Sequence, residues 1–426
     1  ILMTLFLNQE NSKFVIPACQ LHSLLNEHLP LYKEFGFDFS VQNNQIIFSQ
    51  HKVSIQTLGS LLDDYRQNNY EKQIIIFADV GSLKKDLKNI LRITLYKKDW
   101  FNYVDSFLRE KNELSKTYDL LKEKFFLRSF PTQTFMSLNI EEANLIKKLI
   151  KENVDCSDKF VKLNKAFISG WAFWVNLDHE KFEWSLEVEP IDEFLEINEL
   201  LSKNNMIFLS SFRRDTFFKR YLTKHDIKLT SSISLESNFV EKDIITYIPS
   251  KLLLPNNPSF IKSTIDNCKK FLFLSKGVSI FLSNEDNFKI KLATELASIY
   301  GQRVLLENYP NHENQIVCAS YDWWINKLHL ICPPEQIIIP LLPFPNMVEP
   351  INQETISSLR NRSKNWFREF MFPEAFQSID KAVAPLRKNS GKLVILDGRI
   401  SNRKWGRDML EMIQPQKIIN YMYPFD

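Results

Sequence analysis

Short, continuous apolar runs recur through the C-terminal half of this chain, and they constrain its fold more than any other feature. They are rich in β-branched residues, and the stretches 286–300 and 353–371 between them carry apolar positions at helical spacing. Strands that are apolar on both faces are typical of a parallel sheet covered by helices, so the pattern predicts an α/β layer architecture. The predicted strands are MIFLSS (206–211), GVSIFLS (277–283), QRVLLEN (302–308), QIVCAS (315–320), QIIIPLLPF (336–344), KLVILDG (392–398) and KIINYM (417–422).

The N-terminal part repeats this pattern more weakly and predicts a second, smaller sheet, with strands in 13–18, 45–49 and 72–82. Between about 96 and 200 the sequence becomes Lys- and Glu-rich and helical, and then aromatic and β-like in GWAFWVNLDHEKFEWSLEVEPID. Such a block is either an inter-domain bundle or a clamp over a ligand channel. Within it, Glu187 and Glu189 lie at strand spacing, and we expect a solvated edge there.

The composition is globular and limits how the chain can bind other molecules. The 54 basic residues against 51 acidic residues give a net charge of +3, so any nucleic-acid contact must be local rather than a matter of bulk charge. The five cysteines are scattered without a CxxC pair, which predicts neither a metal site nor a disulfide framework and favours a reducing cytoplasm. No apolar run approaches the roughly 18–20 residues that span a bilayer, so no membrane partner is expected.

Familiar nucleotide and hydrolase motifs are missing from the printed sequence. Neither the phosphate loop G-x-x-x-x-G-K-[ST] nor the fingerprint G-x-G-x-x-G occurs. No Ser/His/Asp or Cys/His set stands out among the seven histidines.

The order of several segments nevertheless resembles the DinG/XPD-like branch of the superfamily 2 DNA helicases, most clearly from about 205 to 415. IFLSSFRRDTFFKRYL (207–222) is similar to that family's strand ending in T-S-A-T-L, and GVSIFLSNEDNFK (277–289) is similar to the strand that opens its second motor domain. Three further segments follow in the family's order: SNFVEKDIITYIPSKLLLPNNPSF (237–260), ASYDWWINKLHLICPPEQIIIPLLPFPNMVEP (319–350) and the last helicase motif with its following strand (370–415).

This resemblance implies two RecA-like motor domains with a helical arch-like insertion. Residues 1–95 would be the remainder of the first motor domain and 96–200 the insertion with its return segment. Residues 201–426 would hold the end of the first motor domain and the second one. The family reaction is ATP hydrolysis with Mg²⁺, coupled to separation of single-stranded or forked DNA, and the family suggests a role in DNA repair. An iron–sulfur cluster, found in some members, is not expected here because four clustered cysteines are missing.

The resemblance also implies roles for residues of the motor. Asp79 stands where the DEAH box is expected and would position metal or water, while Ser210 and Ser211 would couple the nucleotide and DNA sites. Arg387, the surviving arginine of the last motif, would contact a phosphate. Asp397 and Arg399 would fix the turn beside the nucleotide, or simply pair with neighbouring groups at the end of their strand.

For nucleic acid, the resemblance points to hydroxyl, amide and guanidinium groups for phosphates and to one aromatic ring for base stacking. Tryptophans in a DWW sequence are also common core anchors, and an Arg-Arg pair is commonly a solvated helix start. The candidates are Arg213, Arg214, Ser283, Asn284 and Trp323.

Departures from the family pattern predict that ATP hydrolysis is weakened or lost. Asp380 and Ala384 stand where the family has Gln and the finger arginine. One acid, Asp79, remains of the two in the DEAH box. KFVIPACQLHSLL (13–25) is similar to the segment that follows the family's phosphate loop, so we expect that loop upstream of Ile1 in a longer gene product.

Two other classes of function stay open. The chain could be a non-catalytic nucleic-acid-binding or scaffold protein that keeps the motor shape without turnover. It could also be a structural interaction protein that docks through the aromatic strand at 170–185. The sequence does not identify the protein partners of this chain.

Overall fold

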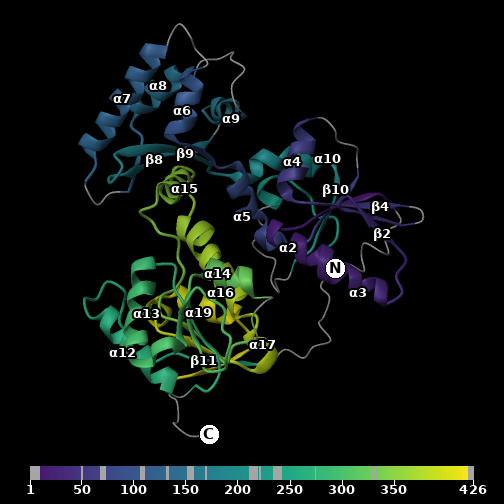
Figure 1. Ribbon diagram of the computed structural model, residues 1–426. Helices are drawn as coiled ribbons and strands as arrows, with labels where there is room; N and C mark the ends of the chain where they lie inside the picture. The colour runs from purple at the N-terminus through teal and green to yellow at the C-terminus, as the bar shows by residue number, and fades with distance from the viewer. Residues whose placement is uncertain are drawn as a thin grey trace. The chain divides into compact units, whose positions relative to one another are not determined.

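The chain forms two compact units (Figure 1). Unit 1 is Ile1–Thr230 with Asn346–Lys364, and unit 2 is Ser231–Pro345 with Asn365–Asp426. The computed structural model describes residues 10–48, 51–67, 73–105, 111–130, 134–150, 158–167, 170–210, 219, 222–233, 242–273, 275–328, 331 and 333–420.

The N-terminal sheet of unit 1 has the order β10-β5-β1-β4-β3-β2, in which β10, β5, β1 and β4 are parallel. Alternate residues of β1 and β5 enter two hydrophobic cores, one on each face of the sheet. The strands are β1 (Ser12–Val15), β2 (Ser40–Gln42), β3 (Gln45–Ile47), β4 (Lys52–Gln56), β5 (Ile74–Phe77) and β10 (Asn205–Phe208). The covering helices are α2 (Ala18–Ser23), α3 (Leu29–Glu34), α4 (Leu58–Arg66), α5 (Val80–Leu91) and α10 (Asn198–Lys203), with the helical turns η1 (Leu24–His28) and η2 (Glu193–Ile197).

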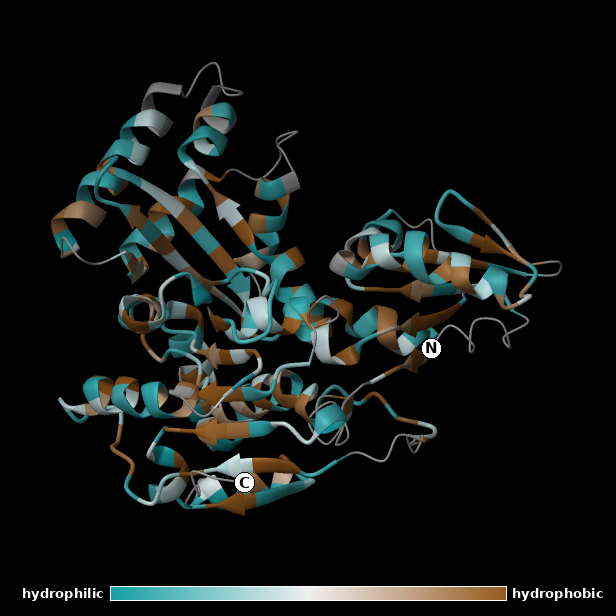
Figure 2. Cartoon of the chain, turned by 60° about the horizontal axis from the view of Figure 1, so that its bottom comes forward, coloured by the Kyte–Doolittle hydropathy of each residue, from teal (hydrophilic) through white to brown (hydrophobic). Residues whose placement is uncertain are grey.

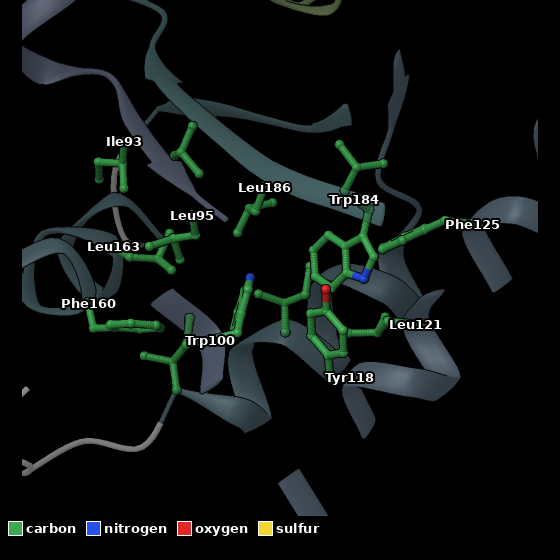
Figure 3. Packing of buried hydrophobic residues seen from close by; sticks show 14 of the residues in the cluster. Ile93, Leu95, Trp100, Tyr118, Leu121, Phe125, Phe160, Leu163, Trp184 and Leu186 are labelled. Carbon is green, nitrogen blue, oxygen red and sulfur yellow. The ribbon is translucent and has the colours of Figure 1, made fainter. Parts of the chain in front are cut away.

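A second part of unit 1 is an antiparallel sheet of order β6-β9-β8-β7 with helices on one face. Its core is unusually aromatic, and Trp184 lies 5.8 Å from Trp100 and 5.0 Å from Tyr118 between ring centroids (Figure 3). The strands are β6 (Ile93–Leu95), β7 (Phe135–Ser137), β8 (Trp171–Asp178) and β9 (Glu183–Pro190). The helices are α6 (Lys97–Asp105), α7 (Lys111–Arg128), α8 (Ile140–Leu149) and α9 (Asp158–Ala166).

The predicted solvated edge at Glu187 and Glu189 is wrong, because both side chains are buried. Glu187 accepts hydrogen bonds from Arg92 Nε at 2.8 Å and from Thr94 Oγ1 at 2.7 Å. Helix α15 (Pro350–Asn361), which comes from a distant part of the sequence, packs on β8 and β7 and covers the face away from the aromatic core. The two glutamates are therefore held inside the unit by Arg92.

Unit 2 is built on one parallel sheet of order β13-β14-β12-β15-β16-β11-β17. Its strands are largely coloured as hydrophobic in Figure 2, as expected for a sheet covered on both faces. The strands are β11 (Ile244–Tyr247), β12 (Ser279–Leu282), β13 (Val304–Leu306), β14 (Ile316–Ala319), β15 (Gln336–Ile339), β16 (Lys392–Ile395) and β17 (Gln416–Ile419). The helices are α12 (Phe260–Phe273), α13 (Asp286–Tyr300), α14 (Tyr321–Lys327), α16 (Phe372–Val383), α17 (Leu386–Asn389), α18 (Arg399–Asn402) and α19 (Trp405–Met412), with the helical turns η3 (Gly301–Arg303) and η4 (Phe367–Met371).

These sheets confirm the predicted α/β class. Each apolar run predicted as a strand in the C-terminal half overlaps an observed strand, and α13 has the predicted bounds. The strands β2, β4, β6, β7 and β11 were not predicted. Within the described part of the chain, no helix is long and apolar enough to cross a membrane.

Glu335 links the segments that precede β12 and β15 to the start of β16, at the amino end of the unit 2 sheet. Its Oε2 accepts hydrogen bonds from the backbone N–H groups of Lys276 at 3.0 Å and Gly277 at 2.5 Å, and from the Ser275 hydroxyl at 3.0 Å. Its Oε1 lies 3.1 Å from Lys392 Nζ. Burial alone would raise the pKa of Glu335, but the Gly277 N–H, Lys392 and Ser275 together bring the pKa below its usual value.

Unit 2 is therefore expected to lose stability in acid partly through Glu335. Because the folded-state pKa is depressed, its contribution is present above the unfolded-state pKa of about 4.3 and is lost as the pH falls through the folded-state pKa. Thermal melting between pH 3 and pH 7 checks this. Glu335→Gln should melt below the wild type at pH 7, and the difference should shrink in acid; a difference that does not change with pH contradicts the role of the charge.

Candidate functional site

The first candidate site lies where β5 and β10 end side by side in unit 1. The two strands are joined beyond their ladder by hydrogen bonds from Leu209 N to Phe77 O at 2.9 Å and from Val80 N to Leu209 O at 3.0 Å. Asp79 directly follows β5 and Ser210 directly follows Leu209, so the fold brings these two predicted site residues to the same edge of the sheet. This is the edge at which parallel α/β sheets bind ligands.

Asp79 also has a structural task at this edge. It is the N-cap of α5, and its Oδ1 accepts a hydrogen bond from Gly81 N at 2.9 Å. An N-cap carboxylate satisfies one of the open N–H groups of the first helical turn and faces the positive end of the helix. The other predicted residues of this segment, Ser211, Arg213 and Arg214, lie outside the described residues.

Asp79→Ala is expected to lower the free energy of unfolding of unit 1 by about 1 kcal/mol, the typical loss for an N-cap. Asp79→Asn keeps an acceptor at the cap and removes the charge, so it should cost much less. Chemical denaturation of both variants measures the difference. If Asp79→Asn is as destabilising as Asp79→Ala, the charge contributes more than the cap does.

The described residues of unit 1 do not form a complete cradle for a nucleoside triphosphate. From the end of β1 the chain passes through Ile16 and Pro17 into α2. Among the described residues, no glycine lies in a loop between a strand of the N-terminal sheet and the helix that follows it. Also within the described residues, no group of three or more His, Cys, Asp or Glu side chains is placed to hold a metal ion. Asp79 is the acidic residue of this edge that could face a hydrated Mg²⁺.

In unit 2, Arg387 is held in an internal ion pair. Its Nη2 lies 2.7 Å from Asp380 Oδ1 and donates a second hydrogen bond to the carbonyl of Ile413 at 3.1 Å. Both side chains of the pair are buried. Asp380 lies on α16 and Arg387 on α17, and the chain turns between them at Ala384 and Pro385. The guanidinium thus joins α16 and α17 to the end of α19, and a phosphate contact would require this pair to open.

Asp397 and Arg399 form a second ion pair, at the carboxyl ends of β15 and β16, in which Asp397 is buried and Arg399 is half-buried. Asp397 is fully buried and accepts hydrogen bonds from the backbone N–H groups of Leu342 and Arg399, both at 2.9 Å. The Arg399 guanidinium lies 2.6 Å from Asp397 Oδ2 and donates to the Leu342 carbonyl at 3.3 Å. The next residue, Gly398, has no room for a side chain because a Cβ would lie 2.4 Å from the Leu253 carbonyl oxygen. The pair fixes the turn after β16.

Three predicted nucleic-acid residues gather at the carboxyl ends of β12 and β14. Ser283 is buried, and its hydroxyl accepts a hydrogen bond from Glu285 N at 3.2 Å. Asn284 Oδ1 accepts one from Tyr321 N at 3.1 Å, at the start of α14. Trp323 lies one turn into the same helix and is half-buried. Ser283 and Asn284 therefore shape this edge, while the Trp323 ring keeps partial access to solvent.

Sequence reasoning missed the neighbours of Trp323. The ring of Tyr309 lies 5.8 Å from that of Trp323, and Lys327 Nζ lies 5.6 Å from the Tyr309 ring centroid. Close by, buried Lys289 is 2.8 Å from Glu307 Oε1, and Glu307 has a left-handed φ of 48°. This left-handed backbone conformation is uncommon for glutamate, so the sequence alone did not predict the position of Glu307.

Glu307 is kept charged by its surroundings. Burial would raise the pKa of Glu307, but Lys289 and the N–H of Ser320 outweigh it and lower that pKa. Its Oε1 accepts the Ser320 N–H at 3.0 Å, which ties β13 to the start of α14. At the carboxyl edge of the unit 2 sheet, Tyr309 and Trp323 therefore form an aromatic pair. The polar groups beside it, Lys289, Glu307 and the Ser320 N–H, are bonded to one another.

Comparison with known proteins gives structural relatives only. The sequence matches no protein-family model and no curated protein. The Xpd4 structure of S. tokodaii is similar with a TM-score of 0.61 at 14% identity, over 98% of this chain and 92% of that one. An apo XPD structure is similar with a TM-score of 0.55 at 13% identity, over 96% of this chain and 91% of that one. The chain therefore has the fold of these XPD structures, with two RecA-like, parallel-sheet domains.

Proposed function

We propose that this chain binds single-stranded DNA on its XPD-like helicase fold and that its ATP hydrolysis is weakened or lost. The observation that carries the proposal is the buried ion pair between Arg387 and Asp380, at 2.7 Å. In the family that the sequence resembles, arginines of this turn reach the phosphates of ATP. A guanidinium that is buried against a carboxylate of its own unit is poorly placed to stabilise charge on a transferring phosphoryl group.

The neighbouring positions support the same proposal. Ala384 stands where the family has its finger arginine, and loss of such a finger lowers turnover by about 10³–10⁵. At the other motor domain, Asp79 is one acid where the family has two, and it caps α5. ATP and Mg²⁺ would be the nucleotide and metal, held chiefly by a phosphate loop that the described residues do not supply.

DNA binding is proposed for the carboxyl edges of the two parallel sheets. Open α/β sheets bind ligands at this edge, and here unit 2 presents the half-buried ring of Trp323. The guanidinium groups of Arg213 and Arg214 would add phosphate contacts from unit 1. With a net charge of only +3, these local groups have to supply the affinity.

Equilibrium binding of a fluorescent single-stranded oligonucleotide, titrated with salt in the presence and absence of Mg·ATP, tests the binding half of this proposal. Binding should weaken steeply with salt, because phosphate contacts release counterions. The protein should also bind a blunt duplex of equal length with lower affinity than the single-stranded oligonucleotide. Absence of binding at low salt contradicts the proposal.

The second candidate function is a non-catalytic scaffold pseudo-helicase, and the Asp380–Arg387 pair favours it too. The two differ in nucleotide coupling: a weakened motor changes its DNA affinity when Mg·ATP is added, and a scaffold does not. For either function we propose a cytoplasmic location, which the scattered cysteines favour. DNA repair is the process that the resemblance suggests.

A further inference from the structure

Four aromatic side chains form a contiguous patch in unit 2 that the proposed DNA contacts do not include. Phe344, Trp366, Phe367 and Trp405, here called the aromatic patch, come from three separate segments of the chain. Trp405 lies 5.0 Å from Phe344 and 5.6 Å from Phe367 between ring centroids, and Phe367 lies 6.2 Å from Trp366. All four side chains are half-buried, so each ring packs on its neighbours and still meets solvent.

Two contacts fix the position of the aromatic patch, one at Phe344 and one beside Trp405. The Arg399 guanidinium, fixed by Asp397, lies 4.9 Å from the Phe344 ring centroid. Gly406 allows the chain around Trp405 to approach the preceding helix, since a Cβ there would overlap the Ile400 carbonyl oxygen at 1.8 Å. Rigid, preorganised rings lose little conformational entropy when a ligand stacks on them.

Positive charge surrounds the patch. The stretch RISNRKWGR (399–407) runs through Trp405 and holds three arginines and one lysine without an acidic residue. Arg403, Lys404 and Arg407 are exposed. Arg368, beside Phe367, pairs with Asp408 at 2.6 Å on the surface. Aromatic rings flanked by exposed cations are complementary to a polyanion that carries flat, unpaired bases.

The patch also lies at the edge of the sheet where ligands bind. Phe344 follows β15 and Trp405 follows β16, each beyond the carboxyl end of its strand. The pair Tyr309 and Trp323 lies beyond β13 and β14 on the same edge, with β12 between β14 and β15 in the sheet. Strands are about 4.8 Å apart, so the two aromatic sites are separated by roughly 10–15 Å along this edge. A few nucleotides of an extended strand span that distance.

We propose that the aromatic patch is a stacking platform for unpaired bases of single-stranded DNA, with Arg403, Lys404 and Arg407 contacting the flanking phosphates. This inference rests on the proposed function and assigns it a site of its own. Stacking is tolerant of sequence because every base has a flat face. The platform therefore binds any unpaired segment and discriminates against a strand that lacks bases.

The test compares two oligonucleotides of equal length and charge on the full-length protein: (dT)20 and a 20-mer of abasic sites. Both offer the same phosphates, and only one offers bases. The wild type should bind (dT)20 roughly tenfold more tightly, the ratio that one well-stacked base contributes. Trp366→Leu, which keeps an apolar side chain, should bring this ratio towards one and leave affinity for the abasic strand unchanged.

A matched control and a second variant keep the result independent of folding defects. Tyr300 also has an arginine over its ring, with Arg303 at 5.5 Å from the ring centroid. It lies at the C-terminal end of α13, away from the carboxyl edge of the sheet. Tyr300→Leu should therefore keep the wild-type ratio of affinities for the two oligonucleotides. The double variant Arg403→Ala/Arg407→Ala changes exposed side chains only. It should weaken both oligonucleotides alike and reduce the salt slope by about one to two.

Each outcome either supports or overturns the stacking platform. A ratio that falls in Trp366→Leu but not in Tyr300→Leu supports the platform. A Trp366→Leu protein that keeps the wild-type ratio overturns the platform and leaves the proposed DNA binding intact. A wild type that binds both strands equally overturns the platform and base stacking on Trp323, and leaves only the phosphate contacts of the proposed function. A wild type that binds neither strand overturns both.

Discussion

Replacing Arg387 by methionine is expected to lower the free energy of unfolding of unit 2 by about 3–5 kcal/mol. The substitution removes the guanidinium and leaves Asp380 as a buried carboxylate without its cation. Hydrogen exchange of the β16 amides, read by mass spectrometry, reports on this unit alone and should show the loss of protection. A merely exposed phosphate-binding arginine would leave the exchange unchanged.

The matched control is the double variant Asp380→Leu/Arg387→Met. Removing both charges leaves no uncompensated group in the interior, so most of the lost stability should return. If Arg387→Met is as stable as the wild type and changes only ATP turnover, the pair with Asp380 does not stabilise unit 2. The guanidinium would then be available to bind a phosphate.

Asp397→Asn should be comparably severe, at about 3–5 kcal/mol. The fully buried carboxylate accepts two backbone N–H groups and the Arg399 guanidinium. Hydrogen bonds to a charged group contribute about 1.5–3 kcal/mol each, and the neutral amide cannot replace them while its NH2 group faces the donors. Chemical denaturation with the same β16 exchange measurement gives the size of the loss.

Asp408→Asn is the control for that experiment. Asp408 also pairs with an arginine, Arg368 at 2.6 Å, but both partners are exposed. Exposed pairs contribute about 0–1 kcal/mol, so this variant should unfold almost as the wild type does. If the two aspartates prove equally costly, burial of Asp397 does not determine the strength of its pair with Arg399.

The class of fold could be predicted because it depends on local patterns. Runs such as QIIIPLLPF and KLVILDG are apolar on both faces, which only a covered strand tolerates, and they became β15 and β16. Strand β4 was missed because KVSIQ alternates polar and apolar residues and lacks such a run. Strand β11 was missed because IITY lies in a segment interpreted as a connector.

The chemistry of the site could be predicted less well, because it depends on distant partners. The spacing of Glu187 and Glu189 correctly put them on one face, but the groups that engage Glu187 there, Arg92 and Thr94, lie far away in the sequence. Similarly, Asp380 and Arg387 were both identified from sequence, yet their pairing depends on the turn between α16 and α17. Residue types indicated which groups were present and not which of them were already engaged.

The most direct test of the central claim is ATP hydrolysis by the full-length gene product with and without saturating single-stranded DNA, under conditions where binding of the DNA is verified. We predict that DNA binds and that hydrolysis is not stimulated, because Arg387 is engaged by Asp380 and Ala384 replaces the finger arginine. DNA-stimulated turnover by the wild type would contradict this account and identify a working motor.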